Sequence, residues 1–301
     1  MTMSPHGPAH VPAPPPGGAS DIDDELPALG RVVEGRRKVR MADVGADRRA
    51  RLDALARYLH DVAEDDAATA ALPPTIGWVL RSTRMEIRTF PALGEDLELR
   101  TFCSATANRW AERTTVAQGS QGATLSAVAI WVAVDSQTGA PARLDERFFS
   151  VYGPSAGGKH ASARLVLGEP DGRVIDRARP WPLRRSDVDA WGHVNNAIAW
   201  AAVEDAVDIG PEDSAVALLE HHVPIGPSVE PVLAVDREGD QWSVWLLDRG
   251  EAAPVAGPGA GPGAGPGAGS VAARVVGPGA GRVLVAATVR ISPAGPSGAR
   301  R

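Results

Sequence analysis

The chain has 301 residues, and its 37 acidic and 31 basic side chains give it a formal net charge of −6. This mild negative charge, without any cluster of Lys and Arg interleaved with aromatic residues, argues against a nucleic-acid-binding protein. The single cysteine, Cys103, excludes an intramolecular disulfide and a thiol-rich metal site. Because the chain shows no charged-then-apolar leader and no apolar run near twenty residues, we expect a cytoplasmic protein with no membrane span.

The length allows two units of roughly 100 to 130 residues, each large enough to bury a core. The segments 1–28, rich in Pro and Gly, and 294–301 are expected to be disordered. Between them we predict a first unit at 29–150, a linker and first strand region at 151–180, and a second unit at 181–293. The Gly/Pro/Ala repeats within 252–281 cannot bury enough apolar surface to fold, so they predict a flexible loop inside the second unit.

The first unit begins with a predicted strand at 31–39 and a turn at 41–49. Apolar residues then recur at spacings of three and four over 52–63, which predicts a helix with one buried face. β-Branched and alternating residues predict antiparallel strands at 79–88, 96–105, 109–117 and 123–134. The basic residues Arg36, Arg37, Lys38 and Arg40, or else Arg184 and Arg185, either form a patch for an acidic partner protein or serve as exposed solubilising charge.

The second unit repeats this order. A predicted strand at 181–185 leads into a turn that contains Asp, then into an apolar helix over 197–203 that ends at Glu204, and then into strands at 214–223, 232–236, 242–248 and 282–291. The two halves therefore read as degenerate copies. In the first copy Arg48 and Arg49 stand about where Gly192 and His193 stand in the second, so we expect one active copy per chain.

The turn before the second helix carries the residues best suited to chemistry. Gly192 permits a sharp turn, and Asn195 or Asn196 can cap the N–H groups at the start of the helix. A helix N-terminus beside a glycine favours the oxyanion that forms when a carbonyl is attacked. Asp189 can act as a general base on water or as a nucleophile, and His193 can orient substrate or water or transfer a proton. The same residues also suit a plain helix cap with a structural histidine, and spacing does not decide between these interpretations.

Four other side chains leave alternatives open. His221 and His222 are adjacent on a predicted strand and point to opposite faces, so only one of them can reach the site, and a metal site is not expected there. Trp191 and Trp200 either line a substrate pocket or belong to the core.

The pattern Asp-x-Asp-x-x-Gly-His-Val-Asn-Asn at 187–196, followed by an apolar helix that ends in acidic residues, resembles the signature of hotdog-fold thioesterases at the start of their central helix. In the first half, 78–87 and 91–97 resemble a strand and turn of one such family, the acyl-ACP thioesterases, and 129–144 is similar to the strand and turn that close that half. The resemblance covers most of residues 31–250. It implies an α+β fold, a double hotdog in which each half is an antiparallel sheet wrapped around a long central helix.

Carried over residue by residue, the family's catalytic Asp, Asn and His fall on Asp189, Trp191 and His193. Trp191 departs from the pattern, because an indole cannot position a thioester carbonyl or a water as an amide does. Either the backbone N–H groups near Gly192 and His193 suffice, or another group takes the place of the amide. The resemblance implies that Trp191 and Gly192 bind the substrate together with Asn195 and Asn196.

Two further positions follow from the resemblance. Some hotdog thioesterases take their catalytic carboxylate from the central helix, which makes Glu204 an alternative base, although helix-end solvation or an ion pair with Arg184 or Arg185 explains it as well. Plant members place a Glu-Cys pair on a later strand, where this chain has Pro224 and Ile225. A cysteine nucleophile is therefore excluded there.

The expected function is hydrolysis of an acyl thioester, with fatty acyl-ACP in fatty acid biosynthesis as the substrate, and with no metal or other cofactor. The resemblance implies that the first half holds the acyl chain and the second half carries the catalytic residues. An acyl-CoA with an aromatic or polyketide-derived acyl group is an alternative substrate. A non-catalytic protein that binds acyl groups or a carrier is a third interpretation, and either a monomer of tandem units or a homodimer fits all three.

Overall fold

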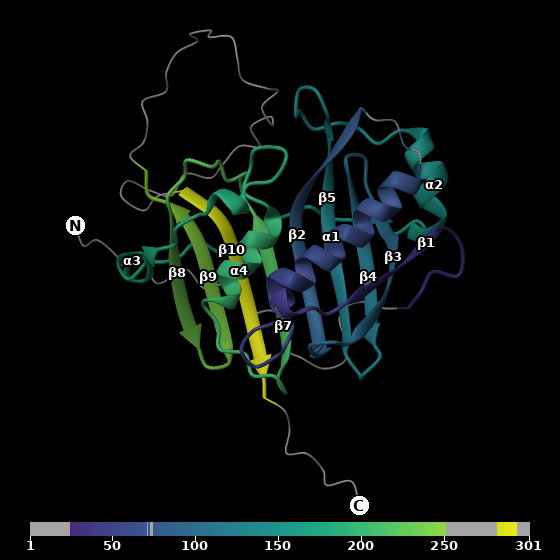
Figure 1. Cartoon of the computed structure of the whole chain (residues 1–301). Coiled ribbons are helices and arrows are strands. Elements are labelled where there is room, and N and C mark those ends of the chain that lie inside the picture. Colours follow the sequence, from purple (N-terminus) through teal and green to yellow (C-terminus); the bar gives the residue numbers. More distant parts are fainter. Residues whose placement is uncertain (1–24, 71, 73–74, 251–281, 294–301) are drawn as a thin grey trace, which may run out of the picture.

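The computed structural model describes residues 25–70, 72, 75–250 and 282–293. The predicted loop at 252–281, the predicted tail at 294–301 and residues 1–24 of the predicted N-terminal segment lie outside these ranges. The described chain forms a continuous antiparallel sheet, and its longest helix lies across one face (Figure 1). Within these ranges, no helix has the length and apolar character needed to cross a membrane.

The described part of the sheet has ten strands in the order β1-β3-β4-β5-β2-β7-β10-β9-β8-β6. The strands are β1 Val32–Lys38, β2 Ile76–Thr89, β3 Asp96–Thr106, β4 Trp110–Gly119, β5 Thr124–Asp135, β6 Arg179–Pro180, β7 Ser214–His221, β8 Pro231–Glu238, β9 Gln241–Asp248 and β10 Arg282–Ser292. The two halves meet where β2 pairs with β7, from Ser82 opposite Glu220 to Ile87 opposite Ala215. β1 to β5 therefore lie on one side of this junction and β6 to β10 on the other.

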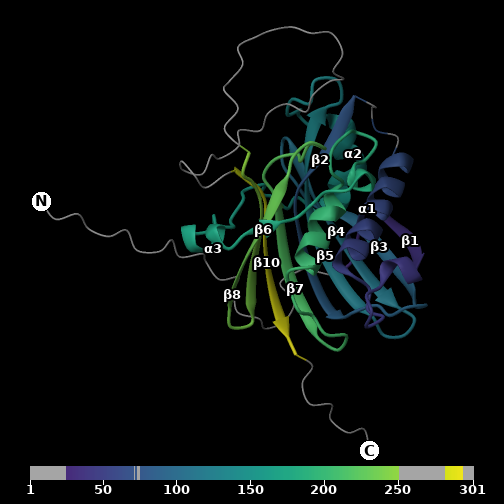
Figure 2. The same cartoon turned by 60° about the vertical axis from the view of Figure 1, so that its left-hand side comes forward.

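The helices of the described residues are α1 Leu52–Thr69, α2 Glu146–Ala156, α3 Gly172–Asp176 and α4 Asn196–Glu204, with short 3-10 turns at η1 Met41–Asp43 and η2 Arg185–Asp187. α1 and α4 lie on the same side of the sheet and contact each other (Figure 1). α3 lies at the far edge of the second half, beside β8 (Figure 2).

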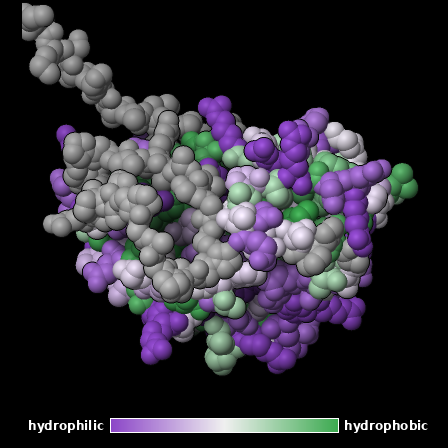
Figure 3. Space-filling view, turned by 90° about the horizontal axis from the view of Figure 1, so that it is seen from above, coloured by the Kyte–Doolittle hydropathy of each residue, from purple (hydrophilic) through white to green (hydrophobic). Residues whose placement is uncertain are grey.

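One hydrophobic core runs through both halves beneath α1 and α4. It joins Leu55 and Trp200 of the two helices to Met85 of β2, Leu219 of β7 and Leu246 of β9. Smaller clusters lie under α2 and under α3. Figure 3 shows that the described face seen from above is mostly hydrophilic, with hydrophobic side chains in small patches.

Two expectations about the second half are wrong. α4 has 9 residues against the 18 of α1, so the second half lacks the long central helix that was expected. Its apolar run ends at Val203, and the Gly210-Pro211 pair soon afterwards cannot continue a helix. The predicted strand at 181–185 is also absent, and only Arg179–Pro180 pairs with β8. Pro180 and Pro182 have no N–H to donate to a sheet ladder, which explains the short pairing.

Candidate active site

The motif at 187–196 forms a tight turn between η2 and α4. The N–H of Asp189 donates to the carbonyl of His193 at 2.8 Å, and the N–H of Gly192 donates to the carbonyl of Asp189 at 3.1 Å. Gly192 has a φ of 80°, a left-handed conformation that glycine adopts without steric cost. The turn therefore depends on Gly192. The backbones of Asp189 and His193 are hydrogen-bonded to each other where the turn closes.

The backbone of this turn holds the Asp189 carboxylate in place. Oδ1 accepts the N–H of Trp191 at 2.9 Å and the N–H of His193 at 3.2 Å. Oδ2 and the two ring nitrogens of His193 make no hydrogen bond to the described residues, and both side chains are half-buried. A carboxylate held through one oxygen can take a proton from water or attack a carbonyl with the other, so the geometry fits both roles of Asp189.

Asn195 caps the helix, as one of the two expected residues. Its Oδ1 accepts the N–H of Ala197 at 2.9 Å, and its own N–H donates to the carbonyl of Asp187 at 2.8 Å. Asn196, the first residue of α4, is half-buried, and its N–H has no hydrogen-bond partner among the described residues. A backbone donor at the positive end of α4 is therefore open to a ligand.

The two tryptophans of the motif region lie in opposite environments. Trp191 sits at the tip of the turn with 81% of its surface exposed, so it does not belong to the core. Trp200 is fully buried between α4 and the sheet. Trp191 stands where the acyl-ACP thioesterases have an asparagine, and its exposed indole does not replace the amide.

The first half contains a copy of this turn. The isolated bridge between Val44 and Ala50, after η1, has its counterpart in the bridge between Val188 and Val194, after η2. Both turns therefore close in the same register before their helices begin.

Position by position, this correspondence pairs Arg48 with Gly192 and Arg49 with His193. Arg48 has a φ of 68°, close to the 80° of Gly192, and it is the non-glycine residue with positive φ in the described chain. The first copy keeps the backbone path of the turn but has a guanidinium where the second has an imidazole.

Glu204 connects the two copies. Its carboxylate binds the guanidinium of Arg49, and its Oε2 accepts the N–H of Leu52, the first residue of α1, at 2.8 Å. Arg49 is 5% exposed, so this ion pair between the halves is buried. Both oxygens of Glu204 are occupied, and its partner is Arg49, not the expected Arg184 or Arg185.

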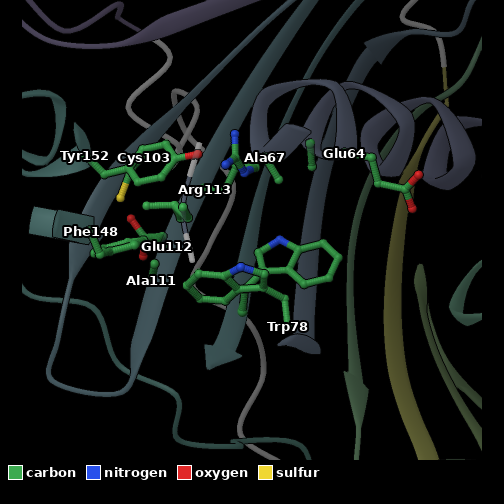
Figure 4. A pocket seen from close by; sticks show the side chains of 12 residues that line it. Glu64, Ala67, Trp78, Cys103, Ala111, Glu112, Arg113, Phe148 and Tyr152 are labelled. Atoms are coloured by element: carbon green, nitrogen blue, oxygen red, sulfur yellow. The ribbon is translucent and has the colours of Figure 1, made fainter. Parts of the chain in front are cut away.

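A cavity of about 170 Å³ lies in the first half, between α1, α2 and the sheet (Figure 4). Trp78, Trp131, Phe148 and Tyr152 line it together with Cys103. Figure 4 shows Cys103, Phe148 and Tyr152 gathered on one side of the cavity. Burial raises the pKa of the Cys103 thiol to about 12, so it stays protonated and inert, as a structural thiol should.

The basic residues of the first strand do not form an unpaired patch. The ion pairs are Arg36 with Glu98 at 3.0 Å, Arg37 with Asp61 at 3.0 Å and Lys38 with Asp96 at 2.9 Å. Arg184 and Arg185, which precede the motif turn, are exposed and have no ion pair within the described residues. No group of three or more His, Cys, Asp or Glu side chains in the described part of the chain is arranged to hold a metal ion.

The structure has a hotdog-like fold, which it shares with two solved thioesterases. A 12:0-ACP thioesterase from Umbellularia californica superposes with a TM-score of 0.64 over 87% of this chain and 97% of its own, at 15% sequence identity. An acyl-ACP thioesterase from Bacteroides thetaiotaomicron superposes with a TM-score of 0.62 over 87% of this chain and 98% of its own, at 13% identity.

The sequence of the first half also matches a family model. Residues 30–152 match the model of the acyl-ACP thioesterase N-terminal domain, which confirms the resemblance found in the first half. An uncharacterised protein of Mycobacterium tuberculosis is 29% identical over 211 residues, which span 69% of this chain and 83% of the relative.

Proposed function

We propose that this protein hydrolyses acyl thioesters, with fatty acyl-ACP as the substrate. The observation that carries the proposal is the joint presence of an acyl-ACP thioesterase N-terminal domain at 30–152 and, in the other half, an Asp–His turn at an open helix N-terminus. The products are a free fatty acid and the thiol of the carrier, as expected for a hydrolase in fatty acid biosynthesis.

The turn offers each group that the reaction needs. Asp189, through its open Oδ2, takes a proton from a water whose oxygen attacks the thioester carbonyl carbon. The carbonyl oxygen then carries negative charge, which the N–H of Asn196 and the positive end of α4 stabilise. When the C–S bond breaks, His193 orients the departing thiolate, gives it a ring proton, and regains the proton that Asp189 took from the water. Gly192 shapes the turn, Asn195 fixes the helix start, and the exposed Trp191 contacts the substrate.

The two halves divide the work. In this proposal the fold is a double hotdog, with a first unit over 29–150 built around α1 and a second unit over 181–293 built around the shorter α4. The cavity lined by Trp78 and Phe148 supports a role of the first unit in holding the acyl chain, because its wall is mainly apolar and aromatic. The second unit carries Asp189 and His193.

The carrier would dock beside the motif turn. Arg184 and Arg185 supply exposed positive charge there, whereas the basic residues of β1 are already paired with acids. An acidic carrier protein fits this arrangement. The buried, unpaired Cys103 supports a location in the reducing cytoplasm. Both a monomer of tandem units and a homodimer accommodate the site.

The test is release of free thiol from palmitoyl-ACP and, separately, palmitoyl-CoA by the purified protein, with Asp189→Asn alongside. Turnover that falls about a thousandfold in the variant supports the reaction and the role of Asp189. Unchanged turnover in Asp189→Asn would remove Asp189 from the mechanism. Equal rates on the two carriers would favour the acyl-CoA alternative, since an enzyme for a carrier protein loses rate when protein contacts are absent.

A second candidate function is favoured by Trp191. Because the family's amide is replaced by an exposed indole, the chain would on this alternative bind acyl groups or an acyl carrier without turning them over. Binding of palmitoyl-ACP with no thiol release, by wild type and Asp189→Asn alike, is the result that would select it.

A further inference from the structure

Three side chains outside the motif turn meet beneath α1, near the junction of the halves. The ring of His60, on α1, meets the indole of Trp131, on β5, edge to face with centroids 5.9 Å apart. Burial lowers the pKa of His221, at the end of β7, and the charge of the nearby His60 lowers it further. Trp131 pairs with Leu80 of β2, and the next residue, Arg81, donates to the carbonyl of His221 at 3.0 Å, so Trp131 and His221 flank β2.

Two nitrogens of this cluster are buried without a partner. Nε2 of His221 and Nε1 of Trp131 make no hydrogen bond within the described residues. Burial lowers the pKa of His60 to about 4 and that of His221 to about 3, so both rings are neutral near pH 7. A neutral imidazole has one N–H donor and one acceptor nitrogen. Buried polar atoms without partners are rare in native proteins, and a catalytic or ligand-binding role is one explanation for them.

In the first half, the start of α1 is the place equivalent to the start of α4, and the N–H of its first residue has a partner. There the Glu204 carboxylate, from α4, reaches the start of α1, and its Oε2 accepts the Leu52 N–H at 2.8 Å. The antiparallel pairing of β2 with β7 relates the halves by an approximate twofold axis. The spacing of the repeated turns makes Asn196 the counterpart of Leu52, and it makes His60 the counterpart of Glu204.

The approximate twofold axis relates the start of α1 to the start of α4. By this correspondence, the place of Glu204 at the start of α1 is equivalent to a place of His60 toward the start of α4, where the Asn196 N–H has no partner in the described chain. In the first copy a carboxylate oxygen of the protein itself fills the helix N-terminus. In the second copy the residue equivalent to Glu204 is His60, which has no carboxylate, and the Asn196 N–H is left without an acceptor within the described residues.

We propose that His60 and His221 complete the reaction site by binding, together with the Asn196 N–H, the carbonyl oxygen of the thioester. The inference rests on the proposed function. The two rings donate hydrogen bonds in place of the amide that is missing at Trp191, and they keep their protons throughout. Charge develops on the oxygen as water attacks, and it returns to the carbonyl when the C–S bond breaks. The first half therefore contributes His60 to the chemistry, and Trp131 links the oxygen site to the cavity in that half.

The test uses His60→Phe and His221→Phe in the full chain, with the acyl-ACP that the wild type hydrolyses. Each variant is expected to lower kcat about 100-fold, as does loss of one donor to a developing oxyanion. His222→Phe is the matched control, because the His222 ring lies 3.8 Å from the carboxylate of Glu220, which points away from the core face that holds Leu219. Its kcat should stay within about threefold of wild type.

A binding measurement separates chemistry from structure. A trifluoromethyl ketone analogue of the thioester adds water and resembles the tetrahedral intermediate, whereas the corresponding thioether has no carbonyl oxygen. The ratio of the two affinities should fall at least about tenfold in the His60 and His221 variants. If the Phe variants do not fold, His60→Met and His221→Met, which also lack a donor, should show the same fall, whereas His60→Gln and His221→Gln, whose amides still donate, should retain part of the ratio.

The outcomes are distinguishable. An active wild type together with unchanged kcat and an unchanged affinity ratio in the His60 and His221 variants would overturn the inference and leave the proposed function intact. A wild type that hydrolyses no thioester would contradict the proposed function itself.

Discussion

At the scale of single residues, the two copies of the turn differ in charge. The first copy pairs Arg49 with Glu204 in a buried ion pair, while the second has His193 in place of Arg49. A guanidinium held in an ion pair does not take part in proton transfer, whereas a histidine with free ring nitrogens can. The sequence alone indicated Asp189 and His193, because they lie in one short motif. His60 lies more than a hundred residues away, so only the fold reveals its position.

The depressed histidine pKa values predict weaker stability in acid. A histidine in the unfolded chain binds a proton below about pH 6.5, whereas folded His60 does so only near 4 and folded His221 near 3. Between these values the unfolded state binds more protons, so stability is full above pH 6.5 and falls as the pH drops toward 4. The urea midpoint should therefore be lower at pH 4.5 than at pH 7. His60→Phe should reduce that difference, and an identical difference in the variant would contradict this assignment.

The contrast between Trp191 and Trp200 predicts two very different costs. Trp191→Ala removes an indole that is 81% exposed, so the free energy of unfolding should change by less than about 0.5 kcal/mol. Trp200→Ala leaves a hole in the shared core and should cost about 3 to 5 kcal/mol. Urea denaturation of both variants tests the pair. A large loss for Trp191→Ala would mean that the indole packs against something in solution.

At the scale of elements, helices and strands with local sequence signals could be predicted, whereas contacts between distant residues could not. α1 follows from apolar spacing over 52–63, and β2 to β5 follow from alternating residues, so these elements are read from neighbours along the chain. α2 was missed, although Asp145 caps it by accepting the N–H of Phe148 at 2.9 Å. Pro154 and two nearby glycines obscured that signal. The cap that Glu204 places on α1 bridges 152 residues and has no local signal at all.

That cap predicts a strong coupling between α1 and α4. Glu204→Ala removes the partner of the buried Arg49 guanidinium and the acceptor of the Leu52 N–H, so it should destabilise the fold by about 3 to 5 kcal/mol. Glu212→Ala, an exposed acidic residue just after α4, should change stability by less than about 0.5 kcal/mol. The comparison is made by urea unfolding. Equal stability of the two variants would show that the ion pair is not formed in solution.

At the scale of the whole molecule, the proposed reaction needs both halves at once. The acyl cavity lies in the first half and the Asp189 turn in the second. Ala111 lines the cavity, and a larger side chain there shortens the space for a chain. Ala111→Leu should therefore lower kcat/KM for a long acyl-ACP about tenfold more than for a short one. A uniform effect on all chain lengths would place the acyl chain elsewhere.

The continuous sheet makes a further prediction about folding. β2 and β7 pair along six residue positions from Ser82 to Ile87, and the core beneath them joins Met85 of the first half to Leu219 of the second. Neither half can unfold without exposing a sheet edge and apolar surface of the other, so the two should unfold as one cooperative unit. Unfolding curves from far-UV circular dichroism and from tryptophan fluorescence should therefore coincide. Residues 29–150 alone should not fold to a stable monomer, because β2 would become an open edge with a bare apolar face. Two separated transitions, or a stable isolated first half, would show that the junction is only a contact between independent domains.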